Sequence, residues 1–317
     1  MKKLFLITCS TILFCIATIG FAQTAEKPQL SDKNYKIYSV KQNKEVTLDD
    51  IVNDMKDYDI VLFGEEHNDS VGHYMEMSLL EHLFAKYGSS VVLSMEMFER
   101  NVQPIVDEYL NGFIKESHFK KDAIAWSNYR DYRPMVEFSK AKGLKVMAAN
   151  ASMRYVSLAN RKGVKELEKL SPEAKTWMAP LPYDTATGKY YEKLREIMGY
   201  NAANNHGDTS QAALAMLSMM PKSLAGHSLW DATMAYSIST VFAKTSTAKV
   251  LHLNGRFHSD DHFGVFQQLQ KYAKGKKVLT ISSVSDKEYP KIDFKSYSEL
   301  ADYIIFTDPN IPKTYKQ

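Results

Sequence analysis

Cysteine is almost absent from this sequence. Its two cysteines, Cys9 and Cys15, both lie within the first 22 residues. The rest of the chain therefore forms no disulfide bond, and it cannot hold a zinc ion or an iron–sulfur cluster through cysteine ligands. Stability has to come from an ordinary hydrophobic core, which a chain of 317 residues is long enough to build.

An excess of charge of either sign is also lacking. The sequence has 40 lysine and arginine residues and 37 aspartate and glutamate residues, so the formal net charge is 40 − 37 = +3. Basic residues are interleaved with acidic ones along the chain. This pattern argues against a nucleic-acid partner and against binding to an anionic membrane surface.

Long apolar runs are missing too, with one exception at the N-terminus. Two lysines precede a largely apolar stretch, Leu4–Ile19, and Gly-Phe-Ala ends it. This is the layout of a cleaved secretory signal, and the stretch is shorter than the roughly 20 residues of a membrane-spanning helix. We expect residues 1–22 to be a signal peptide, the mature chain to have no transmembrane segment, and the protein to be exported to the periplasm or the cell envelope. Lipid attachment at Cys15 and an uncleaved anchor are the alternatives.

From about Tyr35 onward, apolar segments alternate with helical patterns. Short apolar runs typical of parallel strands covered on both faces occur at residues 58–63, 90–95, 144–148, 249–253 and 278–281. Helices are predicted from Thr47 to about Met55, over residues 70–87, from near Pro134 to Gly143, and over residues 224–243. The alternation predicts an α/β fold. We expect a three-layer α/β/α sandwich with a mainly parallel sheet, formed by a single domain over residues 35–308.

Residues 163–226 interrupt this alternation. The stretch contains four prolines and a loop rich in tyrosine and proline, with helical patterns near residues 191–198 and 208–220. We interpret it as a helical insertion over one end of the sheet. The tail after Pro309 is expected to be loose.

Two segments share one pattern. Residues 59–67 (DIVLFGEEH) and 249–258 (KVLHLNGRFH) each lead from an apolar strand into Gly-x-x-His. Open α/β proteins place their ligands at the carboxyl ends of parallel strands. We therefore expect His67 and His258 to meet at one edge of the sheet. Gly64 and Gly255 would allow either a sharp turn or a close approach of the backbone.

Acidic residues follow the predicted strands at the same edge. Glu65 and Glu66 end one strand, and Glu96 ends the next. Charged groups at such positions are costly to bury unless they are paired, metal-bound or solvated. His67, His258 and Glu65 make a ligand set for a divalent metal ion. Without a metal, Glu65, His67, Glu96 and His258 could act as general acids and bases. A non-functional explanation is that Glu66 is solvated and His67 caps the following helix.

Other polar residues are weaker candidates. His73 follows closely enough in the next helix to face the same edge. Arg130 and Arg133 could hold a carboxylate or phosphate, or form structural ion pairs. His227 has no companions in the sequence that suggest a site, and Asp231 is expected to anchor a packed helix.

Seven motifs occur in order along the chain. They are GEEHNDSVGH (64–73), VVLSMEMFER (91–100), YRDYRP (129–134), LKVMAAN (144–150), APLPYD (179–184), LWDATMA (229–235) and HLNGRFHSD (252–260). The set resembles the ChaN-like haem-binding uptake family, within the wider Tiki/TraB/erythromycin-esterase-like superfamily. The resemblance covers most of the mature chain. It implies an α/β/α fold, an extracytoplasmic setting and haem as a partner, and also a distant kinship with metal-dependent hydrolases.

The resemblance further implies a tyrosine ligand to the haem iron and a pair of haems between two subunits, and hence a homodimer. Tyr183 and Tyr132 are the candidates for that ligand. The leading interpretation is an extracytoplasmic haem-binding protein in haem or iron uptake. The alternative is a metal-dependent hydrolase in which His67, His258 and a glutamate hold an ion that activates water.

Overall fold

The computed structural model describes residues 30–206 and 224–316. The predicted signal peptide at residues 1–22 and the helical pattern at residues 208–220 lie outside these ranges. Within them, no helix combines the length and apolar character that crossing a membrane requires.

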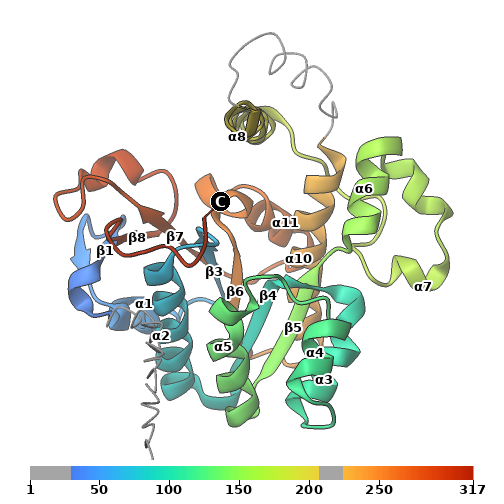
Figure 1. The fold of residues 1–317 in the computed structure, drawn as a ribbon, viewed down its shortest axis with the longest axis horizontal. Coiled ribbons are helices and arrows are strands. Elements are labelled where there is room, and N and C mark those ends of the chain that lie inside the picture. Colours follow the sequence, from blue (N-terminus) through green and yellow to red (C-terminus); the bar gives the residue numbers. More distant parts are fainter. Residues whose placement is uncertain (1–29, 207–223, 317) are drawn as a thin grey trace, which may run out of the picture.

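One eight-stranded sheet forms the centre of the fold, in the strand order β2-β1-β8-β7-β3-β6-β4-β5 (Figure 1). The strands are β1 (Tyr35–Ser39), β2 (Lys44–Val46), β3 (Ile60–Glu65), β4 (Val91–Glu99), β5 (Lys145–Asn150), β6 (Lys249–Gly255), β7 (Val278–Ser285) and β8 (Tyr303–Thr307). The six strands from β8 to β5 run parallel, whereas β1 pairs antiparallel with both β8 and β2. The sheet is mixed but mostly parallel, which confirms the predicted α/β class.

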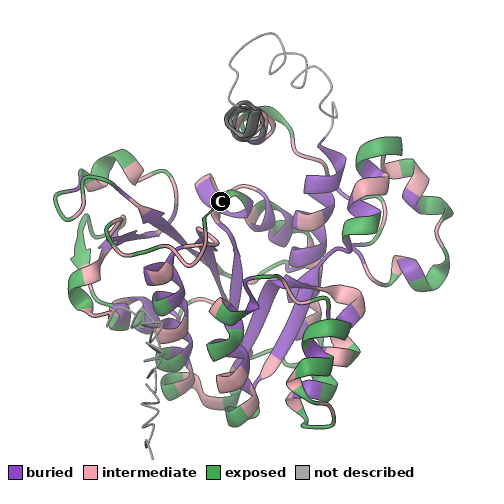
Figure 2. Ribbon diagram, viewed as in Figure 1, coloured by how far each residue is buried: buried purple, intermediate pink, exposed green. Residues whose placement is uncertain are grey.

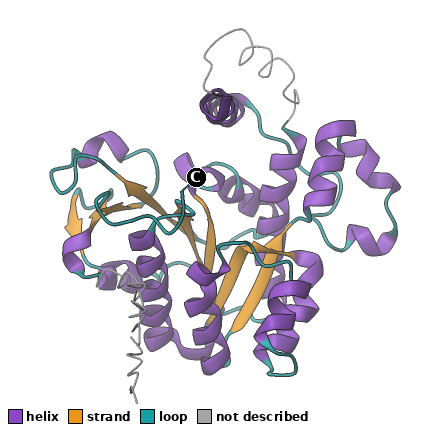
Figure 3. Ribbon diagram, viewed as in Figure 1, coloured by secondary structure: helices purple, strands orange, loops and turns teal. Residues whose placement is uncertain are grey.

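Helices cover both faces of the sheet (Figure 3). They are α1 (Leu48–Asp54), α2 (Ser70–Tyr87), α3 (Gln103–Leu110), α4 (Glu116–Asp122), α5 (Tyr129–Lys142), α6 (Met153–Lys162), α7 (Pro172–Lys175), α8 (Gly188–His206), α10 (Ala225–Lys244) and α11 (Val265–Tyr272). Successive residues of β3 enter two different cores. Val61 and Phe63 pack with α1, α2, α3 and α5, and Ile60 and Leu62 pack with α10 and α11. The strands β3 to β7 are almost completely buried, and Figure 2 colours this part of the sheet accordingly.

Local signals set the ends of α1 and α2 close to where the sequence predicts them, whereas α5 begins at Tyr129, before the predicted start near Pro134, and carries that proline inside the helix. The Thr47 backbone N–H donates to the Asp50 carboxylate at 2.8 Å, which completes a capping box at the start of α1. Helix α2 begins after Asp69, whose carboxylate accepts a hydrogen bond from the Val71 N–H at 3.1 Å. The cap of α2 is thus Asp69, and His67 is left for another role.

The segment after α6 packs against the sheet's helical cover. Leu167, Ala174 and Met178 form a separate core with Leu229 and Ala232 of α10. Helix α8 follows and is seen end-on above the rest of the molecule in Figure 1. The described part of residues 163–226 is therefore mainly helical.

The expectation of a loose tail after Pro309 is wrong. The Thr314 N–H donates to the Asn68 carbonyl at 2.9 Å, and the Lys313 ammonium lies 3.2 Å from a Glu66 oxygen. Arg130 of α5 donates to the Thr314 carbonyl. The tail is held because its backbone groups pair with the loop between β3 and α2.

Candidate active site

Side chains from three neighbouring strands, from the turns that follow them and from the helices α5, α8 and α10 meet at the carboxyl edge of the sheet. Glu65 is the last residue of β3, and it lies opposite Gly255, the last residue of β6. Glu96 lies in β4, where the register against β5 shifts between Met95 and Glu99. Irregularities of this kind re-aim side chains next to sites. His258 follows β6 in a short 3₁₀ turn.

The first part of the site is a pair formed by His67 and Glu65. His67 Nδ1 lies 2.6 Å from Glu65 Oε1, which also accepts a hydrogen bond from the Tyr132 hydroxyl at 2.7 Å. The Glu65 side chain is completely buried, while 29% of the His67 side chain is exposed. Burial works against the charged form of His67, but the hydrogen bond to Glu65 and the charges of Glu65 and Glu96 together outweigh it and raise the histidine's pKa. The Trp126 ring packs edge-on against the imidazole at 5.2 Å.

The second part of the site has the same design. His258 Nδ1 lies 2.6 Å from Asp231 Oδ1, and the Tyr190 hydroxyl donates to the other oxygen of Asp231 at 2.7 Å. Burial opposes a charge on His258, but the carboxylates of Glu96 and Asp231 outweigh it and raise the pKa of His258 to about 9. The His227 ring stacks on the His258 ring at 4.4 Å. Burial and the charge of His258 lower the pKa of His227 to about 4, so His227 is the neutral member.

Glu96 joins the two halves. Its Oε2 accepts a hydrogen bond from the Gly255 N–H at 2.7 Å, and its Oε1 lies 3.5 Å from His258 Nε2. Its charge acts on His67 as well as on His258. The structure thus brings Glu65, His67, Glu96 and His258 into one buried region. A catalytic role for the four residues stays a prediction.

The two glycines allow close approach rather than a sharp turn. Gly255 has φ −56°, which any residue adopts. A Cβ there would lie only 2.7 Å from His67 Nε2. A Cβ on Gly64 would lie 2.9 Å from the Cα of Arg256. Both glycines are needed because the strand ends and the histidine loop are packed too tightly for a side chain.

A further cluster forms where Glu65 meets two side chains of α2, on the side of the glutamate away from His67. His73 Nδ1 is 3.0 Å from Glu76 Oε2 and 3.3 Å from Glu65 Oε2. All three residues are buried. Burial favours a protonated Glu65, but its interactions with Glu76, His67 and His73 together outweigh it and lower the pKa of Glu65 to about 2. Burial and the nearby charge of Glu65 raise the pKa of Glu76 well above its usual range.

Two groups of side chains could hold a metal ion within the described ranges. One is Glu65, His73 and Glu76, and the other is His227, Asp231 and His258. The sequence predicts His67, His258 and Glu65 as ligands. The structure divides this set, since Glu65 belongs to the first group and His258 to the second, and His67 is a member of neither.

Of the other candidates from the sequence, Tyr132 contacts Glu65 and so borders this region, whereas Glu66, Arg133 and Tyr183 lie outside it. Glu66 faces the tail, near Lys313. Arg133 forms an ion pair with Glu116 at 2.6 Å, on the surface. Tyr132 and Tyr183 are buried, and their hydroxyls donate to Glu65 and to the Ala225 carbonyl, respectively. Burial raises the pKa of both tyrosines, and a role as iron ligand stays a prediction for each.

Sequence reasoning missed residues that the helices supply. Glu76 lies three positions after His73 in α2, and Asp231 lies four after His227 in α10. Residues at these spacings share one face of a helix, so the pairs were visible as a signal. Tyr190, from the first turn of α8, had no such signal.

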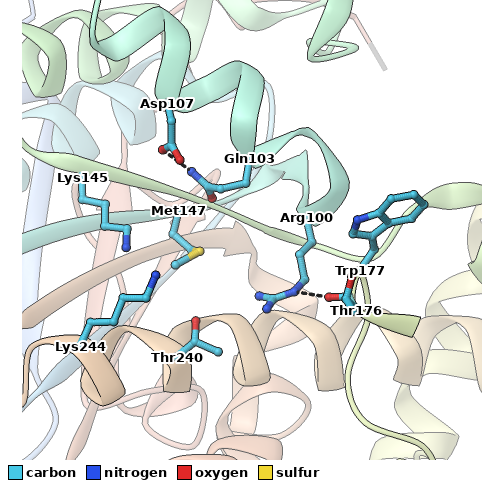
Figure 4. A pocket seen from close by; sticks show the side chains of 9 residues that line it. All are labelled: Arg100, Gln103, Asp107, Lys145, Met147, Thr176, Trp177, Thr240 and Lys244. Carbon is cyan, nitrogen blue, oxygen red and sulfur yellow. Dashed lines mark hydrogen bonds between the residues drawn. The ribbon is translucent and has the colours of Figure 1, made fainter. Parts of the chain in front are cut away.

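A separate groove of about 440 Å³ runs along the edge strand β5 (Figure 4). It lies between α3, α10 and the segment after α7, and its basic side chains are Arg100, Lys145 and Lys244. Burial, followed by the charge of Lys244, lowers the pKa of Lys145. Met147 and Trp177 add apolar surface. Asp107 also lines the groove, so the three basic side chains and this carboxylate leave it with a net positive charge beside an apolar wall.

The chain is similar to known proteins in both sequence and fold. A family model described as haem-binding uptake, Tiki superfamily, ChaN matches residues 51–269. The fold is similar to that of ChaN from Campylobacter jejuni, whose structure shows cofacial haem binding. The TM-score is 0.63 at 17% identity, over 89% of this chain and 100% of that one. At this identity the likeness shows the fold alone.

Weaker similarities extend to two other solved structures. A variant of the erythromycin esterase EreC in its open conformation gives a TM-score of 0.48 at 8% identity, over 88% of this chain and 99% of that one. The type III effector HopBA1 gives 0.45 at 12%, over 83% and 94%. No curated protein matches the chain.

Proposed function

Because the chain belongs to the haem-binding uptake family of the Tiki superfamily, the family of ChaN, we propose that it is an exported protein that binds haem during haem or iron uptake. The observation that carries the proposal is the family match over residues 51–269. The secretory layout of residues 1–22 supports the periplasm or the cell envelope as its location.

The groove along β5 supports haem as the ligand. Haem has a flat apolar ring and two carboxylates, so it requires cations beside an apolar wall. Lys145 and Lys244 supply the cations, and Met147 and Trp177 supply the wall. Arg100 is held by hydrogen bonds to the Thr176 carbonyl at 2.9 Å and to the Ser237 hydroxyl at 3.0 Å, so its guanidinium is already oriented.

Hemin titration tests the proposal. We expect a shifted Soret band that saturates at stoichiometric hemin, and weaker binding for the double variant Lys145→Ala/Lys244→Ala. The matched control is Lys41→Ala/Lys56→Ala, which removes the same charge from exposed positions. No spectral shift in the wild type would reject haem binding. Equal affinity of both double variants would reject the groove but keep the function.

We propose a hydrolase as the second candidate, because two imidazole–carboxylate pairs flank Glu96. In each pair the carboxylate holds Nδ1 at 2.6 Å, which leaves Nε2 to exchange a proton with a substrate or a water molecule. His67, with its partly exposed ring, would be the base, and the protonated His258, whose charge Asp231 and Glu96 maintain, would stabilise the negative charge that develops on the substrate oxygen.

An esterase assay with p-nitrophenyl acetate tests this candidate. We expect His67→Asn and Asp231→Asn each to lower the rate of hydrolysis by about 10²-fold or more. Glu66→Gln, next in sequence to both partners of the first pair, is the control and should retain the rate. A rate that is unchanged in both site variants would exclude the mechanism. A rate that survives prolonged chelation would exclude a requirement for metal.

A further inference from the structure

The cluster of Glu65, His73 and Glu76 has an unusual arrangement of donor atoms. Glu65 is 2%, His73 8% and Glu76 0% exposed. Two carboxylates thus lie close together in the interior. No lysine or arginine within the described ranges lies at ion-pair distance from either carboxylate. Two buried acidic groups in contact require a positive partner, which is either a bound cation or a protonated His73. Burial opposes a charge on His73, but the charges of Glu76 and Glu65 outweigh it and raise the pKa of His73 to about 10.

Two oxygens of the cluster accept no hydrogen bond. Glu65 Oε2 and Glu76 Oε1 are both fully buried and have no donor. The other oxygen of Glu65 is already used by His67 and Tyr132. The two oxygens without a hydrogen-bond donor therefore belong to this cluster and not to the active site in front of it.

The orientation of His73 adds a third donor. Its Nε2 lies 3.1 Å from the His67 carbonyl oxygen, which can only accept, so Nε2 carries a proton. In the neutral ring the lone pair is then on Nδ1, which faces both glutamates. Histidines that ligate metals commonly donate their other N–H to a carbonyl in this way.

The spacing fits a metal ion. Donor atoms that bind Zn²⁺ at 2.0–2.2 Å lie about 3 to 3.5 Å apart. His73 Nδ1 is 3.0 Å from Glu76 Oε2 and 3.3 Å from Glu65 Oε2, and the three residues offer donor atoms within 4.8 Å of one another. One imidazole and two carboxylates suit Zn²⁺ or Mn²⁺.

We propose that Glu65, His73 and Glu76 bind a divalent transition-metal ion that is sealed beneath the active site. The ion uses Oε2 of Glu65 and leaves Oε1 to His67, so it fixes the carboxylate that orients that imidazole. Its role is positioning, because the cluster is too enclosed to admit a substrate. This ligand set differs from the one that the sequence predicts, since it contains neither His67 nor His258. The competing occupants of the cluster are protons on His73 and Glu76.

Metal analysis of the mature chain tests the proposal. The protein is purified without chelator, stripped, and reconstituted separately with Zn²⁺ and Mn²⁺. We expect the wild type to retain about one equivalent of one of these ions after desalting, and to gain thermal stability with it. Retention of less than about a tenth of an equivalent of both ions would show that protons fill the cluster.

Variants locate the ion. Glu76→Gln keeps the shape of the side chain and should lose most of the metal, whereas His258→Ala and Glu66→Gln should keep it. Circular dichroism checks that Glu76→Gln is folded, and Glu76→Asp, which keeps a carboxylate, should restore part of the binding. Metal that survives Glu76→Gln but is lost in His258→Ala would place the ion in the other group and overturn the proposal.

Substitution with Co²⁺ provides a readout that does not depend on stability. The visible bands of bound Co²⁺ should appear in the wild type, disappear in Glu76→Gln, and be unchanged in His258→Ala. Identical spectra in wild type and Glu76→Gln would also reject the proposed ligands.

Discussion

At the scale of single residues, Glu65 shows how one side chain connects two sites. Oε1 pairs with His67 and Tyr132 at the front, and Oε2 faces His73 at the back. Each interaction restricts the carboxylate in a different direction. The pair with His67 is thus set by groups on both sides of the glutamate.

The two close-packed glycines should respond differently to substitution. A Cβ on Gly255 meets the tip of the His67 side chain, which can move, whereas a Cβ on Gly64 meets the backbone of Arg256, which cannot. We expect Gly255→Ala to lower the free energy of unfolding by about 1 kcal/mol and Gly64→Ala by about 3 kcal/mol. Urea denaturation measures both values. Equal costs would contradict the assignment of the contacts.

His252 should make stability fall in acid. It is fully buried in β6, with Nδ1 2.9 Å from the Ser94 hydroxyl and Nε2 without a partner. Burial, and then the charge of His258, lowers its pKa to about 3, below the value of about 6.5 in the unfolded chain. Between these values the unfolded chain takes up a proton that the native state does not. Stability is therefore complete above pH ~6.5 and falls by up to about 1.4 kcal/mol per pH unit below it.

The variant His252→Leu, of similar volume, isolates this effect. Its unfolding free energy should depend less on pH than that of the wild type between pH 6.5 and 5, in urea titrations at several pH values. If the unfolding free energies of the two proteins changed with pH in the same way, His252 would have the same pKa in the folded and unfolded chain.

At the scale of elements, the sequence predicted β3 to β7 and missed β1, β2 and β8, which lie together at one end of the sheet. β3, β4, β5, β6 and β7 are nearly continuous apolar runs because both faces are covered, and all five were predicted. β2 (Lys44–Val46) has no buried residue, so its sequence carries no apolar signal. β8 (Tyr303–Thr307) is buried throughout and carries the same signal as the others, so it could have been found.

The residues of the site also fall into those that the sequence predicts and those that it does not. Glu65, His67, Glu96 and His258 are at strand ends, where the direction of a parallel strand fixes which edge a residue reaches. Glu76, His227 and Asp231 come from helices. The spacing of three or four residues shows that two of these side chains share a helix face, but which face meets the sheet depends on packing across the whole core.

One side chain satisfies backbone groups along the exposed edge of β5. The Gln103 amide donates to the Val146 carbonyl at 2.9 Å and accepts from the Ala148 N–H at 2.7 Å, as a further strand would. We expect Gln103→Ala to cost about 1–2 kcal/mol and to promote self-association through the open edge. Urea denaturation and light scattering measure the two effects. Gln267→Ala, at an exposed position, is the control, and a similar response from it would refute the role of Gln103.

At the scale of the whole molecule, the carboxyl tail supports the loop that carries His67. Thr314 bonds to Asn68 and accepts from Arg130, and Lys313 pairs with Glu66. Removal of residues 310–317 should lower the melting temperature by a few degrees and speed hydrogen exchange in the β3–α2 loop, with the circular dichroism spectrum unchanged. Removal of residues 316–317 alone should have little effect. Unaltered exchange in the longer truncation would show that the loop stands without the tail.

The strand order also governs when the molecule can fold. β3, near the start of the chain, is flanked by β6 and β7, and β1 pairs with β8. Neither the middle of the sheet nor its antiparallel side can close until the last third of the polypeptide has been synthesised. A nascent chain of this topology stays unfolded on the ribosome for most of its translation. Such a delay in folding would keep the proposed secretory precursor unfolded, which is the state in which a chain passes through a translocation channel.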